Sequence, residues 1–173
     1  DSHTNTKEIL KKVGYLPSEV SYYDGMNSKQ LLEYSARFYE NADVSKIQTL
    51  AEYFELDLKK KIKKLSLGNK KKCAIIQCML HDPDLLILDE PTSGLDSTTA
   101  MVLVEMLRIL CNRGMTIVCC IHQPRENIFM QFDRLLLLEA GRTAFFGPAA
   151  ECRQYLESIQ LPNSVTLQLP PFT

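Results

Sequence analysis

The strongest constraint on the fold is a short apolar run that ends abruptly in two acids. Residues 85–88 are aliphatic, Asp89 and Glu90 follow them, and a proline lies close to the run on each side. An apolar run of this length between breakers predicts a strand of a parallel sheet that is buried on both faces. Ligands of open α/β sheets lie beyond the carboxyl ends of the strands. The two carboxylates are therefore expected where a ligand would lie.

Two neighbouring carboxylates in this position suit phosphoryl transfer. In such sites one acid holds Mg²⁺, usually through water, and a second acid orients or deprotonates the attacking water. The alternative for Asp89 and Glu90 is a plain strand end with a solvated acidic turn. A Ser-Gly-Leu-Asp turn follows directly at residues 93–96. That turn favours the phosphoryl-transfer interpretation.

Length and composition fit one globular domain and limit the classes of function. The chain has 173 residues, of which 45% are hydrophobic and 24% charged. This is enough for one domain with a sizeable core. The net charge of -1 argues against a general nucleic-acid binder. No apolar run approaches a membrane span in length, and no signal peptide is visible. The six cysteines form no metal-type Cys-x-x-Cys pair and predict reduced thiols in a cytosolic setting.

The second candidate site is the start of a helix upstream of the acidic strand. Residues 65–69 read Leu-Ser-Leu-Gly-Asn, and a helix is expected to begin at Gly68. A small hydroxyl residue such as Ser66 and a glycine at a helix N-terminus suit an anion, because N–H groups are free and the backbone can approach closely. A simple helix cap explains the same residues. The flanking lysine runs, 59–64 and 70–72, predict either a solvated face or a surface that attracts phosphate.

The third candidate is His122. Residues 116–121 are mostly apolar and β-branched and predict a second buried strand, with His122 at its carboxyl end. That places the imidazole at the same sheet edge as Asp89 and Glu90. A neutral imidazole can donate a hydrogen bond to a γ-phosphate and orient a water molecule. A lone histidine is more often structural, and its place at this edge is what favours the functional interpretation.

The remaining segments alternate between strand and helix patterns. Residues 161–173 contain no charged residue and two adjacent prolines, which predicts a disordered tail or linker. The other expected elements are a strand at 13–16, a helix capped by Ser28, a helix at about 44–54, a helix at 97–112 ended by Gly114, a short helix at 125–131, a hairpin at 132–146 and a last helix at 149–159.

The order of these motifs resembles an ATP-binding cassette (ABC) ATPase. Residues 85–96 look like the Walker B motif and D-loop, residues 65–69 like the signature, and residues 121–124 like the switch-histidine segment. Residues 13–17 resemble the approach to the Q-loop, where Ser18 stands in place of the usual glutamine. No Gly-x-x-x-x-Gly-Lys-Ser/Thr occurs in the sequence, so the P-loop (Walker A) is expected upstream of residue 1 or is absent.

The two halves of the chain resemble different members of this family. Residues 14–19 and 65–69 are similar to bacterial drug-export ATPases. The resemblance changes near Ser97, and residues 123–124, 132–133 and 145–148 resemble the white/pigment and pleiotropic-drug subfamily. A chimera and a divergent lineage both remain open as explanations.

The resemblance implies a fold and a function. The fold is α/β: a P-loop NTPase-type, mostly parallel sheet with an inserted helical subdomain at about residues 27–80, within a partial nucleotide-binding domain at residues 1–160. The function is ATP hydrolysis that powers transmembrane transport at the cytoplasmic face of a membrane. The implied partners are a second, head-to-tail nucleotide-binding domain and a transmembrane domain, with no nucleic acid. The alternative is a non-catalytic fragment or regulatory module, because a triphosphate without a P-loop loses its main anchor. This chain alone is then expected to be inactive.

The resemblance also implies roles for residues near the ATP of the same domain. Glu90 is the general base and His122 the sensor of the γ-phosphate. Asp89 contacts Mg²⁺, through water, beside the bound ATP. Ser18 binds water at the position of the Q-loop glutamine, with a shorter reach.

A second group is implied to act between two domains. Ser66, Gly68 and Asn69 contact the ATP held by the opposite domain, and Ser93 and Asp96 link the two sites. The signature departs from the usual Leu-Ser-Gly-Gly-Gln, since leucine replaces its first glycine and Asn69 replaces its glutamine.

Overall fold

The structure is a computed structural model that describes residues 5–20, 22 and 25–158. It divides into two compact units, Asp1–His122 and Gln123–Thr173. The tail expected at residues 161–173 lies outside the described residues. The expected domain boundaries stay a prediction.

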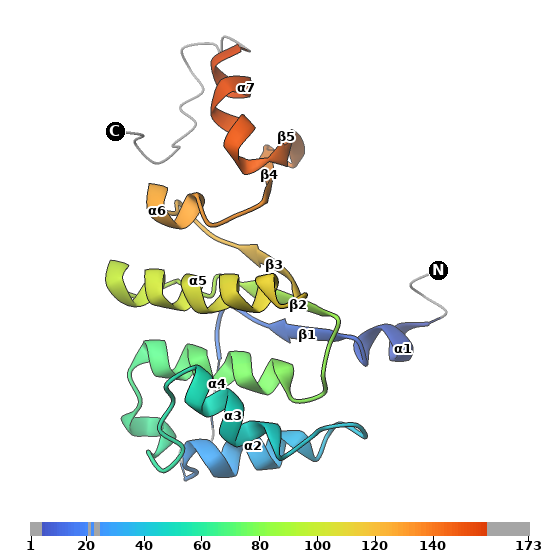
Figure 1. Cartoon of the computed structure of the whole chain (residues 1–173), viewed down its shortest axis with the longest axis vertical. Helices are drawn as coiled ribbons and strands as arrows, with labels where there is room; N and C mark the ends of the chain where they lie inside the picture. Colours follow the sequence, from blue (N-terminus) through green and yellow to red (C-terminus); the bar gives the residue numbers. More distant parts are fainter. Residues whose placement is uncertain (1–4, 21, 23–24, 159–173) are drawn as a thin grey trace. The chain divides into compact units, whose positions relative to one another are not determined.

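The first unit is built on a three-stranded parallel sheet in the order β1-β2-β3 (Figure 1). The strands are β1 (Val13–Leu16), β2 (Leu85–Asp89) and β3 (Thr116–Cys120). β2 pairs in register with both neighbours, so the three carboxyl ends lie at one edge of the sheet. The expected α/β class with a parallel sheet is confirmed, and so is the shared strand edge on which the site prediction rests.

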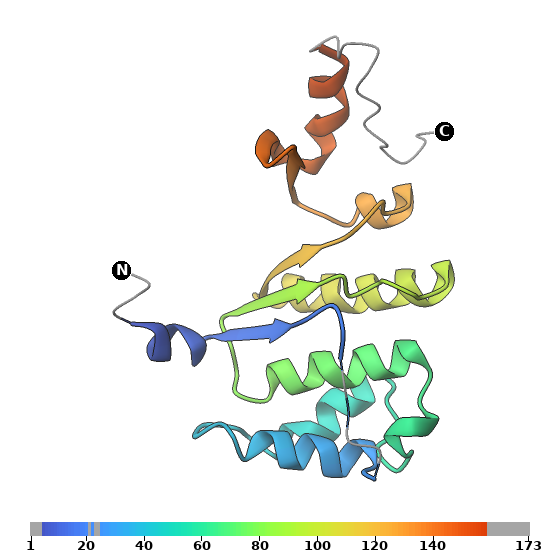
Figure 2. The same ribbon diagram turned by 180° about the vertical axis from the view of Figure 1, so that it is seen from behind.

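Two helices cover one face of this sheet. α4 (Leu67–Met79) packs against β1, and α5 (Ser97–Asn112) packs against β3. Figure 2, the view from behind, shows the strands in front of α5. None of the described helices, α5 with its 16 residues included, is both long and apolar enough to cross a membrane.

The strands are buried on one face only, which corrects the expectation of fully buried strands. Leu86 and Leu88 of β2 are fully buried, whereas Ile87 between them is only half-buried. β3 alternates between half-buried and exposed residues, and Val118 is 55% exposed. The physical reason is that α4 and α5 pack on the face where Ile117 and Cys119 lie, whereas Val118 lies on the opposite face. An apolar run indicates a parallel strand but does not reveal how many layers cover it.

The segment between β1 and β2 is helical, as expected. α2 (Ser28–Ala36), α3 (Lys46–Tyr53) and the short 3₁₀ helix η1 (Ile62–Lys64) precede α4. The apolar faces of these helices share one core with α4 and with the buried face of the sheet. This core fixes α4 against the strands, and α4 carries the candidate signature at its first turn.

The N-cap of α2 is Asn27 and not Ser28, which corrects the sequence prediction. The Asn27 side chain accepts a hydrogen bond from the Gln30 N–H at 2.8 Å, and the Gln30 side chain accepts one from the Asn27 N–H at 3.0 Å. This reciprocal pair is a capping box. Ser28 is buried, and its N–H and hydroxyl bond the Lys60 carbonyl instead.

The two lysine runs differ in exposure. Every lysine in residues 59–64 is exposed, which fits a solvated face and a phosphate-attracting surface alike, so both interpretations of that run stay predictions. Lys71 and Lys72 are only 3% and 8% exposed, so neither a solvated face nor a phosphate-attracting surface describes them. The reason is their position on α4, which packs on the sheet on one side and on α2 and α3 on the other.

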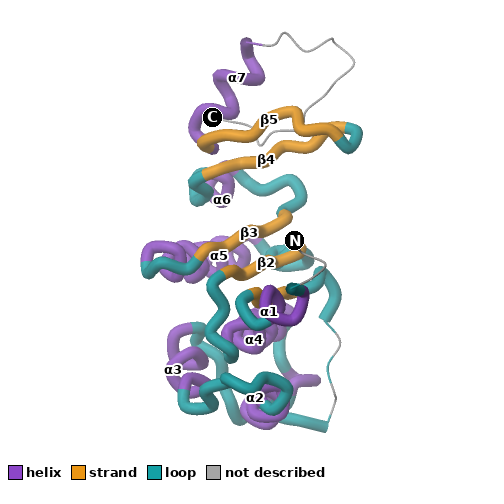
Figure 3. The backbone as a smooth tube through the Cα atoms, turned by 90° about the vertical axis from the view of Figure 1, so that its right-hand side faces the viewer, coloured by secondary structure: helices purple, strands orange, loops and turns teal. Residues whose placement is uncertain are grey.

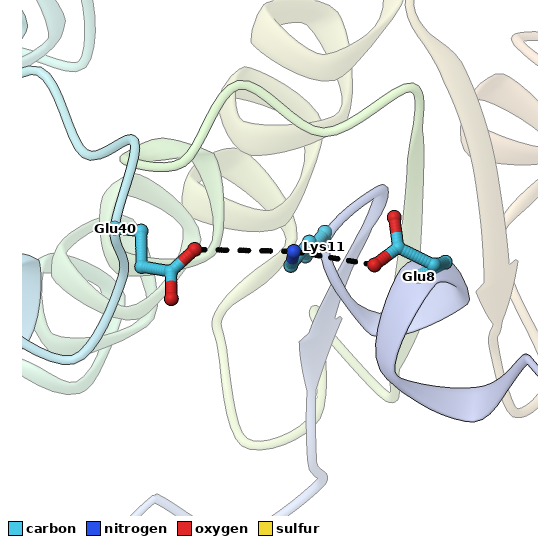
Figure 4. A network of polar contacts seen from close by, with 3 residues as sticks. All are labelled: Glu8, Lys11 and Glu40. Atoms are coloured by element: carbon cyan, nitrogen blue, oxygen red, sulfur yellow. Dashed lines mark hydrogen bonds and ion pairs between the residues drawn. The ribbon is translucent and has the colours of Figure 1, made fainter.

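A surface ion-pair cluster lies near the start of the chain. Lys11 follows α1 (Thr6–Leu10), and its Nζ lies 3.2 Å from Glu8 Oε1 and 3.9 Å from Glu40 Oε2 (Figure 4). All three side chains are more than half exposed. Water screens such pairs, so they contribute little to the free energy of unfolding.

The second unit is a hairpin with short helices, close to the sequence prediction (Figure 3). Its strands β4 (Arg134–Glu139) and β5 (Arg142–Pro148) pair antiparallel, and Ala140-Gly141 joins them. Its core consists of Phe129, Phe145, Ala149, Cys152 and Leu156. Its elements are α6 (Glu126–Phe129), β4 (Arg134–Glu139), β5 (Arg142–Pro148), the 3₁₀ helix η2 (Ala149–Glu151) and α7 (Cys152–Ser158).

The close packing of β1 on α4 gives the first testable prediction. A Cβ on Gly14 would overlap the Cys78 carbonyl oxygen and would lie 2.6 Å from Leu86 Cδ2. Gly14→Ala is therefore expected to lower the free energy of unfolding by about 1–3 kcal/mol through overpacking. Gly25→Ala is the matched control, because a Cβ there meets no atom of the described residues within 4 Å. Urea unfolding measures both variants, and equal midpoints would contradict the packing of β1 on α4.

Candidate functional site

The carboxyl edge of the sheet holds a pocket of about 270 Å³. It is lined by Glu90, Thr92, Ser93, Gly94 and His122. Glu90 follows β2 and His122 follows β3, so the parallel register brings them together. Three residues chosen from the sequence thus share one pocket. Thr92 and Gly94 were missed, although their position within the turn after the acids could have found them.

The backbone of Glu90 is strained and firmly held. Its φ is +45°, in the left-handed region that is uncommon for a residue with a side chain. Its N–H donates to the Cys120 carbonyl at 3.0 Å, and its own carbonyl accepts from the Ser93 N–H at 3.1 Å and from Lys71 Nζ at 3.0 Å. Such a conformation costs about 1–3 kcal/mol and persists where the surroundings over-determine it, often at functional sites.

Lys71 was missed as a site residue. It extends from α4, and its Nζ donates to the carbonyl oxygens of Ser18 at 2.9 Å and of Glu90 at 3.0 Å. Burial lowers the pKa of its ammonium group, while the negative charges of Glu90 and Asp89 oppose that shift. Helical spacing could have indicated that Lys71 is buried, because Lys71 lies one turn before the apolar Ile75 on the same face of the helix, and Ile75 is buried.

Ser18, the residue at the Q-loop position, is exposed and follows β1. It does not line the pocket. Its carbonyl oxygen accepts the hydrogen bond from Lys71, so its backbone is linked to the pocket region through that side chain. The role expected for its hydroxyl stays a prediction.

Asp89 ends β2 beside the pocket. It is half-buried, pairs with Cys120 across the ladder and is not among the pocket-lining residues. The described residues contain no group of three or more His, Cys, Asp or Glu side chains that could hold a metal ion. Mg²⁺ in nucleotide sites keeps several waters and takes one or two carboxylates together with substrate phosphates. The adjacent Asp89 and Glu90 fit that donor set.

The signature residues begin α4. Ser66 is the N-cap, and its Oγ accepts a hydrogen bond from the Asn69 N–H at 3.4 Å. A Cβ on Gly68 would lie 2.7 Å from Thr99 Cγ2, so the absence of a side chain lets α4 approach the start of α5. The helix-cap interpretation is confirmed. The role of Ser66, Gly68 and Asn69 toward a nucleotide stays a prediction.

The signature loop also packs against the pocket rim of the same chain. A Cβ on Gly94 would lie 2.7 Å from Leu67 Cδ2, and the φ of Gly94 is +74°, so this position requires glycine on both counts. Asp96 caps α5 by accepting hydrogen bonds from the N–H groups of Thr98 and Thr99. The Thr99 side-chain hydrogen bond is the main reason that the pKa of Asp96 is lowered. Asp96 therefore has a structural task within its own chain.

Comparison with protein families identifies one match, and comparison with curated proteins gives relatives consistent with it. The model of the family described as "ABC transporter" matches residues 1–93. ABC transporter G family member 26 of Arabidopsis thaliana is 40% identical over 111 residues, covering 64% of this chain and 16% of that protein. Protein white of Drosophila melanogaster is 43% identical over 99 residues, covering 57% of this chain and 14% of that protein.

A third relative extends over nearly the whole chain. ABC transporter G family member 22 of Arabidopsis thaliana is 32% identical over 167 residues, covering 89% of this chain and 22% of that protein. Similarity to the G family therefore includes both halves of the chain, and the expected likeness to the white subfamily is confirmed. The bacterial drug-export character of the first half stays a prediction. The chain spans only 14% to 22% of the length of these three relatives.

A solved structure has the same fold. It is the dimeric ATP-binding cassette MJ0796 in a post-hydrolysis state bound to ADP and Pi, with a TM-score of 0.70 and 22% identity. The match covers 86% of this chain and 68% of that one. At this identity the likeness concerns the fold, and it confirms the expected α/β architecture. Since the family model covers residues 1–93 of 173, which is more than half, the chain belongs to the ABC transporter family.

Proposed function

We propose that this chain, as part of a nucleotide-binding domain with a P-loop, binds and hydrolyses ATP to power transport across a membrane. The observation that carries the proposal is the pocket that joins Glu90 and His122 at the carboxyl edge of the sheet. Membership of the ABC transporter family supports the ATPase activity. The relatives named as transporters support a transmembrane partner and a place at the cytoplasmic face of a membrane.

Glu90 is the general base in this proposal. It lines the pocket, and three hydrogen bonds hold its main chain, so the point from which its side chain starts is fixed before substrate binds. It accepts the proton of the water that attacks the γ-phosphate. His122 lines the same pocket and donates a hydrogen bond to the γ-phosphate or the attacking water.

Asp89 is the residue that would hold Mg²⁺, through a water molecule. When bound, Mg²⁺ neutralises charge that develops on the phosphates. Asp89 is one residue from Glu90 and lies at the same end of β2, so one short turn supplies both carboxylates. Ser18 would bind water from the turn after β1.

The partner in this proposal is a second nucleotide-binding domain, arranged head to tail. Ser66, Gly68 and Asn69 would contact the ATP of that domain through the N-terminus of α4. Ser93 and Asp96 would link the two sites. Leu67 of the signature loop packs against Gly94, which lines the pocket with Glu90. This contact supports such a link, because it joins the signature loop to the pocket of the same chain.

The sequence contains no P-loop, and this gives a prediction for the isolated chain. We expect poor ATP binding or none, because a backbone cradle and a lysine supply most of the hold on a triphosphate. Isothermal titration calorimetry with Mg-ATP measures the affinity. A dissociation constant of about 1 μM for the monomer would show that another loop replaces the P-loop.

The ATPase proposal itself is tested with the P-loop-restored protein, meaning this sequence preceded in one chain by an ABC P-loop segment. Steady-state phosphate release above that of a protein without the P-loop supports the proposal. Tight Mg-ATP binding without turnover would instead favour the alternative, a non-catalytic module. A P-loop and transmembrane segments encoded beside this stretch in the gene would favour the transporter.

A further inference from the structure

Lys71 joins three segments that the proposed function treats as separate. It stands on α4, four residues after the start of that helix, and its Nζ is within 3.0 Å of two carbonyl oxygens. One carbonyl belongs to Ser18, directly after β1 and Pro17, and the other to Glu90, directly after β2. One ammonium group therefore ties the signature helix, the Q-loop position and the acidic turn together.

The contact is buried and charged, which makes it strong for its size. Lys71 is 3% exposed, and hydrogen bonds from a charged donor are worth roughly twice those between neutral groups. Burying the ammonium costs solvation free energy, which its two carbonyl partners and the nearby negative charges offset. Lys72 is the useful contrast: it is 8% exposed on the same helix, but the hydrogen bonds to the Ser18 and Glu90 carbonyls come from Lys71.

The carbonyl that Lys71 contacts belongs to a pocket-lining residue with a strained main chain. Glu90 has a φ of +45°, and its carbonyl oxygen is oriented by the Ser93 N–H and by Lys71 Nζ. A peptide plane held at this point determines where the Cα–Cβ bond of Glu90 points. Removing one of the two donors lets that plane rotate, and the carboxylate moves with it.

We propose that Lys71 is a positioning residue that holds the main chain of Glu90 in the conformation from which its carboxylate acts, using Ser18 as the second anchor. The inference rests on the proposed function, because it concerns the same ATPase site. Lys71 touches neither water nor nucleotide in this role. It acts through Glu90, so its removal affects turnover and leaves nucleotide affinity unchanged.

The test is Lys71→Met in the P-loop-restored protein. Methionine fills the apolar path of the lysine stem and removes the ammonium. We expect kcat to fall about 10- to 100-fold while KM for Mg-ATP stays within about twofold, since a small misplacement of a reacting group costs this much in rate. Lys72→Met, the matched control on the same helix, is expected to change neither value by more than about twofold.

A double-variant measurement separates positioning from a general structural role. In a Glu90→Gln background there is no carboxylate left to position, so adding Lys71→Met is expected to lower the residual turnover by less than about twofold. A purely structural lysine would instead multiply the two losses. Binding of a fluorescent nucleotide checks that each variant is folded, and Lys71→Leu, which also lacks a donor, replaces Lys71→Met under the same criteria if the methionine variant is not.

Three results would overturn the proposal: full turnover in Lys71→Met, equal losses in Lys71→Met and Lys72→Met, or multiplicative losses with Glu90→Gln. Each leaves the proposed ATPase function standing, because the parent protein still hydrolyses ATP. Absence of turnover in the parent would reject the proposed function itself. The two failures are therefore distinguishable in one series of measurements.

Discussion

Glu90→Gln in the P-loop-restored protein is expected to bind ATP normally and to lose about 10²- to 10⁴-fold in turnover, the usual contribution of a general base. Glutamine preserves the shape of the side chain but cannot accept the proton of the attacking water. The backbone hydrogen bonds of Glu90 do not involve its carboxylate, so they should survive the substitution. Binding and turnover should therefore separate cleanly.

Steady-state phosphate release and fluorescent-nucleotide binding measure the two quantities. Glu105→Gln is the matched control, because Glu105 is an exposed glutamate on α5 outside the pocket. Its turnover is expected to equal that of the parent. Turnover of Glu90→Gln within a few-fold of the parent would remove Glu90 from the role of base and leave His122 or a bound water to be examined next.

The parallel sheet and the pocket were predictable because both depend on local pattern and on one topological rule. Asp89, Glu90 and His122 each end or follow an apolar run, and carboxyl ends of parallel strands meet at one edge. That rule brought Glu90 and His122 together without knowledge of any side-chain contact. Ser93 came with them because it follows Glu90 within the same turn.

Burial was predicted less well, because it depends on what covers a residue and not on the residue itself. The apolar run 116–121 was expected to be buried, yet Val118 is 55% exposed. Lys71 was expected at the surface, yet it is 3% exposed. Nothing in the lysine run 70–72 indicates that Lys71 has buried carbonyl partners, because those partners, Ser18 and Glu90, are distant from it in sequence.

The N-cap of α2 was predicted as a small polar residue, which is right, but it was placed at Ser28, one position after the actual cap, Asn27. Asn27 and Ser28 are both good N-cap residues, and only the position of Gln30 decides between them. The N-cap of α4 was easier, because Ser66 is followed by the small Gly68 at the helix start. Whether that helix start also binds a nucleotide depends on a second domain, which the sequence of one chain does not describe.

Ser66→Arg is expected to abolish ATP-driven dimerisation while leaving nucleotide binding to the same chain's own P-loop nearly intact. Ser66 is exposed at the N-terminus of α4 and is not among the residues that line the pocket with Glu90. An arginine there would fill the space through which the γ-phosphate of a partner must approach the helix N–H groups. Loss of the cap costs about 1 kcal/mol, which a packed helix tolerates.

The experiment uses the P-loop-restored protein with Glu90→Gln in the background, so that bound ATP persists. Light scattering measures dimer formation on addition of Mg-ATP, and a fluorescent nucleotide measures binding. Ser45→Arg is the matched control, because Ser45 is an exposed serine at the start of another helix, α3, and it is expected to leave dimerisation unchanged. If Ser66→Arg destroyed nucleotide binding while dimerisation survived, the signature loop would belong to the site of its own chain. The contact between Leu67 and Gly94 would then explain the loss of nucleotide binding, because the arginine would disturb the pocket that Gly94 and Glu90 line.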